Sequence, residues 1–239
     1  MYLVFLIILL TGCANKSAES DVYDPIEPVN RAIWDVNYGY IDPYLYRPAS
    51  VAYTEYVPSP ARTGMSNFLS NLEEPTSVVS RLIMLQPDQA ITHFSRFFIN
   101  TTLGLGGLLD IATLLDIRIE QRDFSDAMGY YGVGNGAYVM LPLYGPLSVR
   151  EGVGDTINGF ISPMTFWQSV AKWGFEGLDS RAKLIPQEPM IESSTDSYIF
   201  IRDSYIQNQN YKASDGELDI SDDVEDEMSL EDYFDEIDN

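Results

Sequence analysis

Apolar residues recur every three to four positions along much of the chain. In residues 24–40, for example, they stand at positions 26, 29, 33, 36 and 40. Further segments with this spacing lie in residues 65–72, 78–83, 87–98, 149–160, 163–185 and 190–211. Because such a repeat places side chains on one face of an α-helix, each segment predicts a short amphipathic helix.

Proline residues mark several of the expected helix ends. Pro60 precedes the second segment at a position typical of a helix start, and Gln86-Pro87 separates the third segment from the fourth. The alternation typical of a strand is confined to residues 138–141, which end at Pro142. The pattern therefore predicts an all-α fold, a single domain of many short amphipathic helices.

Residues 97–115 form an apolar segment with an unusual composition. They include eleven apolar residues, three glycines and a single charge, Asp110. An aspartate near the centre of a spanning helix costs roughly 2.5–3.5 kcal/mol on insertion, so this segment is a poor membrane span. Gly104, Gly106 and Gly107 favour a bend instead. Two alternatives remain open from the residues alone: a hairpin at a membrane interface, or a hairpin inside a soluble core.

The N-terminal residues have the features of a lipoprotein export signal. Residues 1–12 are an apolar run that is short for a membrane span and typical of a signal peptide. The string LTGC that follows resembles the bacterial lipobox, so Cys13 is expected to carry lipid and residues 14–23 to form a tether. Ala14 after the cysteine favours the outer membrane by resemblance to lipoprotein sorting signals. The alternative is an ordinary secretory signal with a chance cysteine.

The negative charge of the chain is concentrated at its C-terminal end. The net charge is −22, and residues 215–239 contain 13 Asp or Glu and no Lys or Arg. Blocks of like charge without apolar periodicity do not form a packed core, so residues 217–239 are predicted to be an acidic disordered tail. This charge balance argues against nucleic acid as a partner, because phosphate binding needs clustered basic residues.

The sequence lacks the residue patterns of an enzyme or a metal site. His93 is the only histidine, in a helical segment where a structural role is expected, and no G-x-S-x-G motif occurs. The glycines of residues 132–136 lead into AYVMLP rather than a helix, so they do not form a dinucleotide loop. Five acids between Asp110 and Asp126 alternate with Arg118 and Arg122 and are interpreted as a solvated, self-paired face. We predict no catalytic activity, no metal and no cofactor.

Several longer strings resemble the VacJ/MlaA lipoprotein family. INTTLGLGG and YGVGNGAYVMLP are the most specific, because neither helix amphipathicity nor turn chemistry alone requires them. The resemblance covers about residues 24–216, nearly all of the chain between the tether and the tail. The other strings are DPIEPVNRAIWDVN, PSPARTGMSNFLSNLEEP and DSYIFIRDSYIQNQNYKASDG.

The resemblance implies a ring-like α-helical body embedded in the inner leaflet of the outer membrane, on its periplasmic face, with a central amphipathic channel. It implies retrograde transport of phospholipid: stray lipid from the outer leaflet would pass through the channel to a periplasmic phospholipid carrier. The implied neighbour is an outer-membrane porin trimer, and no cofactor is needed. The alternative is a structural envelope lipoprotein that tethers porins without moving lipid.

The same resemblance favours the interfacial hairpin for residues 97–115 and places candidate site residues in two segments. Residues 138–146 would then form a wall of the channel. The candidates are Asn100, Thr101, Thr102, Gly104, Gly106, Gly107 and Asp110 in the hairpin, and Tyr138, Met140, Leu141 and Pro142 in the wall. Cys13 is the candidate lipidation site.

Overall fold

The computed structural model describes residues 22–162 and 164–216. Cys13, the predicted signal peptide, most of the tether and the acidic tail lie outside the described residues. The elements are α2 (Glu27–Val36), η1 (Asn37–Tyr46), α3 (Arg47–Tyr56), α4 (Ser59–Ile83), α5 (Pro87–Thr102), α6 (Ile111–Leu114), α7 (Phe124–Tyr130), β1 (Tyr138–Leu141), β2 (Gly145–Ser148), α8 (Val149–Ile161), α9 (Phe166–Leu184), η2 (Ile185–Gln187), α10 (Glu188–Ser193) and α11 (Ser197–Ala213).

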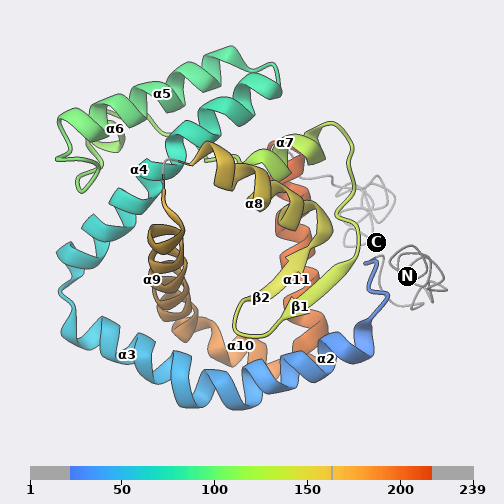
Figure 1. Cartoon of the computed structure of the whole chain (residues 1–239). Coiled ribbons are helices and arrows are strands. Elements are labelled where there is room, and N and C mark those ends of the chain that lie inside the picture. The colour runs from blue at the N-terminus through green and yellow to red at the C-terminus, as the bar shows by residue number, and fades with distance from the viewer. Residues whose placement is uncertain (1–21, 163, 217–239) are drawn as a thin grey trace, which may run out of the picture.

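The helices are arranged as a ring (Figure 1). The continuous path α2–η1–α3 forms one side, α4 forms the next, and α5 lies against the far end of α4. Helices α7, α8 and α11 close the ring on the opposite side, while α9 and the β1–β2 hairpin lie toward its middle. The predicted all-α class and ring-like shape are confirmed, and the two short strands are a small addition to it.

Local sequence signals explain most of the element boundaries. Helix α4 has Pro60 in its first turn, and α5 begins at Pro87, as predicted. The side chain of Asp123 caps α7 in a reciprocal capping box with Asp126. Separate helices for residues 65–72 and 78–83 were a wrong expectation, because one helix, α4, continues through Pro75.

Two asparagines fix the β1–β2 hairpin to the ring. The strands pair antiparallel from Tyr138 opposite Ser148 to Leu141 opposite Gly145. Asn30 of α2 donates to the Tyr138 carbonyl (3.1 Å) and accepts from the Met140 amide (2.9 Å). Seven residues later, two helical turns along, Asn37 donates to the Leu141 carbonyl (2.9 Å). Side chains of α2 and η1 thus replace the missing third strand and hold the hairpin inside the ring.

The apolar core is small. Tyr138, Met140, Tyr198 and Ile206 form its buried centre, where β1 meets α11. Among the described residues, buried polar and charged side chains outnumber buried apolar ones, and many large apolar side chains are exposed. This distribution is the reverse of a typical soluble domain.

Candidate functional site: an inverted helical hairpin and two adjoining cavities

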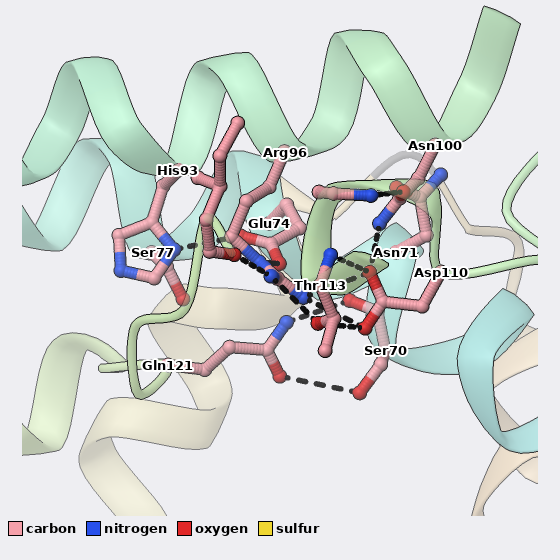
Figure 2. A network of polar contacts seen from close by, with 12 residues as sticks. Ser70, Asn71, Glu74, Ser77, His93, Arg96, Asn100, Asp110, Thr113 and Gln121 are labelled. Atoms are coloured by element: carbon pink, nitrogen blue, oxygen red, sulfur yellow. Dashed lines mark hydrogen bonds and ion pairs between the residues drawn. The ribbon is translucent and has the colours of Figure 1, made fainter. Parts of the chain in front are cut away.

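Helices α4 and α5 pack with polar side chains between them, and α5 turns its apolar face outward. Ile91, Phe94 and Phe98 are each more than half exposed on the outer side of α5. Glu74 and Ser77 of α4 and His93 of α5 are buried between the two helices (Figure 2). The amphipathic stripe of α5 was located correctly from the sequence, but it points away from the protein interior, whereas Leu69 in the stripe of α4 is buried.

A buried carboxylate joins the two helices. Glu74 Oε2 lies 2.6 Å from His93 Nδ1, and Glu74 Oε1 accepts from Arg96 Nε at 2.9 Å. Breaking a buried pair by removing one partner typically costs about 3–5 kcal/mol, since the other charge is left uncompensated. His93 therefore has the structural role expected for it, which is to order the polar interior of the hairpin.

Asn100 and Asp110, two of the predicted hairpin residues, belong to the same network (Figure 2). Asn100 Nδ2 donates to Asp110 Oδ1 (2.9 Å), and its Oδ1 accepts from the Ala112 amide (2.9 Å). Asp110 caps α6 by accepting from the Thr113 amide and pairs with Arg96 at 3.2 Å. Burial alone would raise the pKa of Asp110, but the bonds from Thr113 and Asn100 and the charge of Arg96 outweigh it and lower that pKa.

The two predicted threonines lie at the end of α5 and are exposed. Thr101 Oγ1 accepts from Asn71 Nδ2 (2.9 Å), which connects it to the buried side of α4. Thr102 Oγ donates to the Phe98 carbonyl within its own helix (2.7 Å). Thr101 therefore belongs to the polar network, whereas Thr102 only satisfies its own hydroxyl.

The three predicted glycines form the bend that follows α5. Gly106 and Gly107 have φ of +77° and +98°. Leu105, which follows Gly104, also has a positive φ, of 56°. A β-carbon on Gly104 would lie 2.2 Å from the Leu109 carbonyl oxygen. The second arm, however, is only the four-residue helix α6, so the hairpin is a long helix with a compact cap rather than two equal arms.

Apolar side chains project from this cap in continuity with those of α5. Leu105 is 69% exposed and Leu114 is 80% exposed. Within residues 22–162 and 164–216, no helix combines the length and the apolar character needed to cross a membrane. The leucines of the cap and the phenylalanines of α5 are thus exposed on the surface of the described residues.

The larger of two cavities has charged walls and a volume of about 670 Å³. It lies between α4, α7, α8 and α9 and is bordered by five carboxylates and three cations. Lys172 donates to Glu73 (2.5 Å) and to Glu176 (2.9 Å). Burial alone would lower the pKa of Lys172, but these two carboxylates outweigh it and raise that pKa. The charged lining residues are Glu73, Arg122, Asp123, Asp126, Asp155, Lys172, Glu176 and Lys212.

The smaller cavity, of about 470 Å³, has mainly apolar and aromatic walls. It lies between η1, the β1–β2 hairpin and α9, and an ion pair of Arg181 with Asp42 (2.6 Å) stands at its border. Its apolar and aromatic lining residues are Trp34, Tyr38, Tyr46, Met140, Leu143, Tyr144, Pro146, Trp173, Leu184, Ile191 and Ile201.

One pair of aromatic rings borders both cavities. Tyr144, in the hairpin turn, and Trp173, on α9, line each of them, and their rings stack at a centroid distance of 6.2 Å and an interplanar angle of 4°. The Tyr144 hydroxyl donates to Asp155 Oδ2 on the side of the larger cavity (3.2 Å). Burial, followed by the charges of Asp155 and Glu151, raises the pKa of Tyr144. A charged space and an apolar space therefore meet at a single aromatic wall.

The predicted wall residues are distributed differently around these cavities. Met140 lines the smaller cavity, whereas Tyr138 lies in the apolar core. Leu141 is half-buried, Pro142 is exposed, and neither borders either cavity. The sequence did not identify Trp173 or the charged residues of α8 and α9 as cavity residues. Nothing in the local pattern distinguishes a helix that faces a cavity from a helix packed in a core.

The expected solvated, self-paired face between residues 110 and 126 is only partly correct. Asp116 and Arg118 do pair on the surface at 3.3 Å. Arg122 and Asp126, however, are buried and border the larger cavity. The capping box of α7 turns Asp126 inward, and the charge pattern of the sequence gave no sign of it.

Comparison with known proteins gives consistent matches over the same part of the chain. Residues 22–212 match the family described as MlaA lipoprotein. The intermembrane phospholipid transport system lipoprotein MlaA of Escherichia coli is 41% identical, over 88% of this chain and 86% of that protein. Its namesake in Haemophilus influenzae is 38% identical, over 97% of this chain and 95% of that protein.

A solved structure from work on the structural basis for maintenance of bacterial outer membrane lipid asymmetry resembles the fold. Its TM-score is 0.76 at 44% sequence identity, with coverage of 80% of this chain and 98% of that chain. The ring and its two cavities lie within the matched residues.

Proposed function

Because this chain belongs to the MlaA lipoprotein family, we propose that it is the lipoprotein of an intermembrane phospholipid transport system. In this role it removes mislocalised phospholipid from the outer leaflet of the outer membrane and passes it to a periplasmic carrier, which maintains lipid asymmetry. The MlaA relatives are named for phospholipid transport and not for a catalysed reaction.

The observation that carries this function is the pair of adjoining cavities inside the ring. A phospholipid has a charged headgroup and apolar acyl chains, and each part needs an environment of its own polarity. The larger cavity offers ion-paired walls and the smaller one offers aromatic walls, with Tyr144 and Trp173 common to both. Both volumes fall within the roughly 300–1,000 Å³ range of ligand sites.

The outer surface of the ring supports a position within one leaflet. Fully covering a leucine side chain by an apolar medium is worth roughly 1.5–3 kcal/mol, and the α5–α6 end exposes several of them. Charged and polar groups of the α4–α5 hairpin, among them Arg96 and Asn100, bond on its inner side, which leaves the apolar outer face of α5 to contact acyl chains. We propose that acyl chains on Cys13, outside the described residues, add a second attachment to the outer membrane.

The proposed partners follow from the direction of transport. Phospholipid is the cargo, the periplasmic carrier receives it, and the inner leaflet of the outer membrane holds the ring. A porin trimer beside the ring is proposed from the family resemblance.

A blocked cavity tests transport directly. Gly177 lines the smaller cavity, and a β-carbon there would have no atom within 4 Å, so Gly177→Trp introduces a large side chain at the cavity wall without a collision at its β-carbon. Gly39 in η1 offers the same open surroundings outside both cavities, which makes Gly39→Trp a matched control. In cells lacking the native gene, we expect Gly177→Trp, but not Gly39→Trp, to leave phospholipid in the outer leaflet, measured as outer-leaflet acyl-transfer products.

The same pair separates transport from tethering. A protein that only tethers porins predicts equal lipid asymmetry for both variants at equal membrane levels. Normal asymmetry with Gly177→Trp at normal abundance would therefore exclude passage through this cavity. Purified protein should also carry phospholipid that transfers to an added carrier, and Gly177→Trp should carry less.

A further inference from the structure

The larger cavity holds carboxylates whose negative charge has no direct partner. Glu73 and Glu176 pair with Lys172, as described above. Asp123, Asp126 and Asp155 border the same space, and no ion pair links any of them to a cation within the described residues. The lining as a whole has five carboxylates against three cations, a formal charge of −2.

Asp126 is the most unusual member of this set. Its side chain is 1% exposed, its Oδ2 accepts from the Asp123 amide at 3.0 Å, and its Oδ1 has no hydrogen-bond partner in the described part of the chain. An unsatisfied buried carboxylate oxygen is destabilising, because it has lost its hydrogen bonds to water without gaining a protein donor. Such an atom beside a cavity is accounted for when a ligand supplies the missing donor.

The neighbouring carboxylates also lack a directly paired cation, and the more distant charges of Lys172 and Lys212 offset only part of the effect of burial on Asp155. Burial and the nearby charge of Asp123 raise the pKa of both Asp126 and Asp155. Asp155 is exposed and lines the cavity, and the one hydrogen bond to its side chain from the described residues comes from the neutral Tyr144 hydroxyl. These groups are therefore stabilised by any positive charge that enters the cavity.

Two kinds of cation could enter, and the geometry favours one of them. Within the described residues, no group of three or more acidic, histidine or cysteine side chains is placed to hold a metal ion. An organic ammonium needs only separate hydrogen-bond acceptors spread around it, which these carboxylates provide. Lys212 borders the same cavity and has no ion pair among the described residues. A ligand with both charges could therefore place its cation beside the carboxylates and its anion beside Lys212.

We propose that the larger cavity binds the amine-bearing headgroup of a zwitterionic phospholipid, with its ammonium between Asp123, Asp126 and Asp155 and its phosphate toward Lys212. This proposal rests on the proposed function and adds a headgroup preference to it. The acyl part of the lipid then lies beyond the Tyr144–Trp173 wall, in the apolar cavity. A headgroup that carries the phosphate but no ammonium leaves all three carboxylates uncompensated.

The test measures the binding of defined lipids to the purified full chain. Phosphatidylethanolamine, its N-acetyl derivative and phosphatidylglycerol compete in detergent with a fluorescent phospholipid. N-acetylation removes the positive charge and keeps the phosphate, so it isolates the ammonium. We expect phosphatidylethanolamine to bind about tenfold more tightly than the other two lipids, because only it can form a charge-assisted hydrogen bond from its ammonium to the carboxylates.

Three variants locate the effect. Asp155→Asn keeps an acceptor for Tyr144, and Asp126→Asn keeps an acceptor for the capping box, so each retains the hydrogen bond of the native carboxylate. Asp116→Asn removes the same charge from an exposed surface pair and serves as the control. Each cavity variant should lose at least threefold of the preference, and the control should keep it.

The outcomes separate this proposal from the proposed function. Equal binding of all three lipids, or an unchanged preference in both cavity variants, would overturn the headgroup assignment while leaving transport intact. No binding of any phospholipid by the native chain would instead overturn transport itself. Should Asp126→Asn fail to fold, Asp155→Asn at its exposed position decides the matter alone.

Discussion

The bend after α5 allows its three glycines to be ranked by the cost of adding one methyl group. Gly106 has φ of +77° and open surroundings, so Gly106→Ala incurs only the strain of a left-handed alanine, about 1 kcal/mol. At Gly107, φ is +98° and the new β-carbon would lie 2.6 Å from Asn71 Cβ. Strain and overlap together predict about 2–4 kcal/mol for Gly107→Ala.

Gly104 is restricted for a different reason. Its φ is not in the left-handed region, but an added β-carbon would lie 2.2 Å from the Leu109 carbonyl oxygen and 2.5 Å from that of Asn100. Both obstacles are backbone atoms, which cannot rotate away, so Gly104→Ala should cost about 3 kcal/mol or more. Since 1 kcal/mol shifts Tm by roughly 2–4 °C in a chain of this size, the expected losses are about 2–4 °C for Gly106→Ala and 6–12 °C for Gly104→Ala.

Thermal unfolding in mild detergent measures these shifts, with the three alanine variants compared under one condition. The expected order is Gly106→Ala least affected, then Gly107→Ala and Gly104→Ala. Equal Tm values for Gly104→Ala and Gly106→Ala would refute the described bend. Outer-leaflet phospholipid in cells with Gly107→Ala, at matched protein level, then shows whether the bend matters for transport as well as for folding.

Three further predictions concern the two ends of the protein. Cys13→Ser should accumulate as precursor or leave the outer-membrane fraction, since acyl chains contribute about 0.8 kcal/mol per buried CH₂; membrane fractionation with a carbonate wash checks it, and undiminished recovery would contradict it. Truncation after Gly216 should preserve Tm, whereas truncation after Ser214 should lower it, because Asp215 pairs with the buried Arg81 at 2.6 Å. Equal Tm values for the two truncations would show that this ion pair does not stabilise the fold. Burial alone would raise the pKa of Asp215, but hydrogen bonds from Arg81 and Gln86 outweigh it and lower that pKa. The ionised Asp215 therefore stabilises the fold above about pH 4, and this stabilisation is lost as the pH falls below that value. Asp215→Asn should show a smaller loss of Tm on acidification than the native chain.

Helix positions were accessible from the sequence because proline and periodicity act locally. Pro60 and Pro87 fall in the first turns of α4 and α5, where a missing amide hydrogen costs nothing. Pro75 misled the same reasoning, since the packing of α4 against α5 outweighs one lost helical bond. The strand 138–141 was expected, but its partner 145–148 carries Gly and Pro and gave no signal.

The direction in which each helix faces was not accessible in this way. A stripe at positions 91, 94 and 98 has the same period whether it meets a protein core or acyl chains. Only the buried network of Glu74, His93 and Arg96 on the opposite face settles the orientation. Likewise, the two cavities combine residues from η1, α4, α8 and α9, and no local pattern indicates that these distant segments meet.

In the proposed position within one leaflet, lipid completes the native state of this protein. Folding in water alone would leave Leu105 and Leu114 hydrated, so part of the hydrophobic gain arrives only when acyl chains cover them. Lipid or detergent that covers this outer face binds the folded state and not the unfolded chain, so it stabilises the fold as a ligand does. Its free energy of unfolding is thus a joint property of the chain and the surrounding leaflet. Outside a leaflet, the same exposed apolar face favours aggregation.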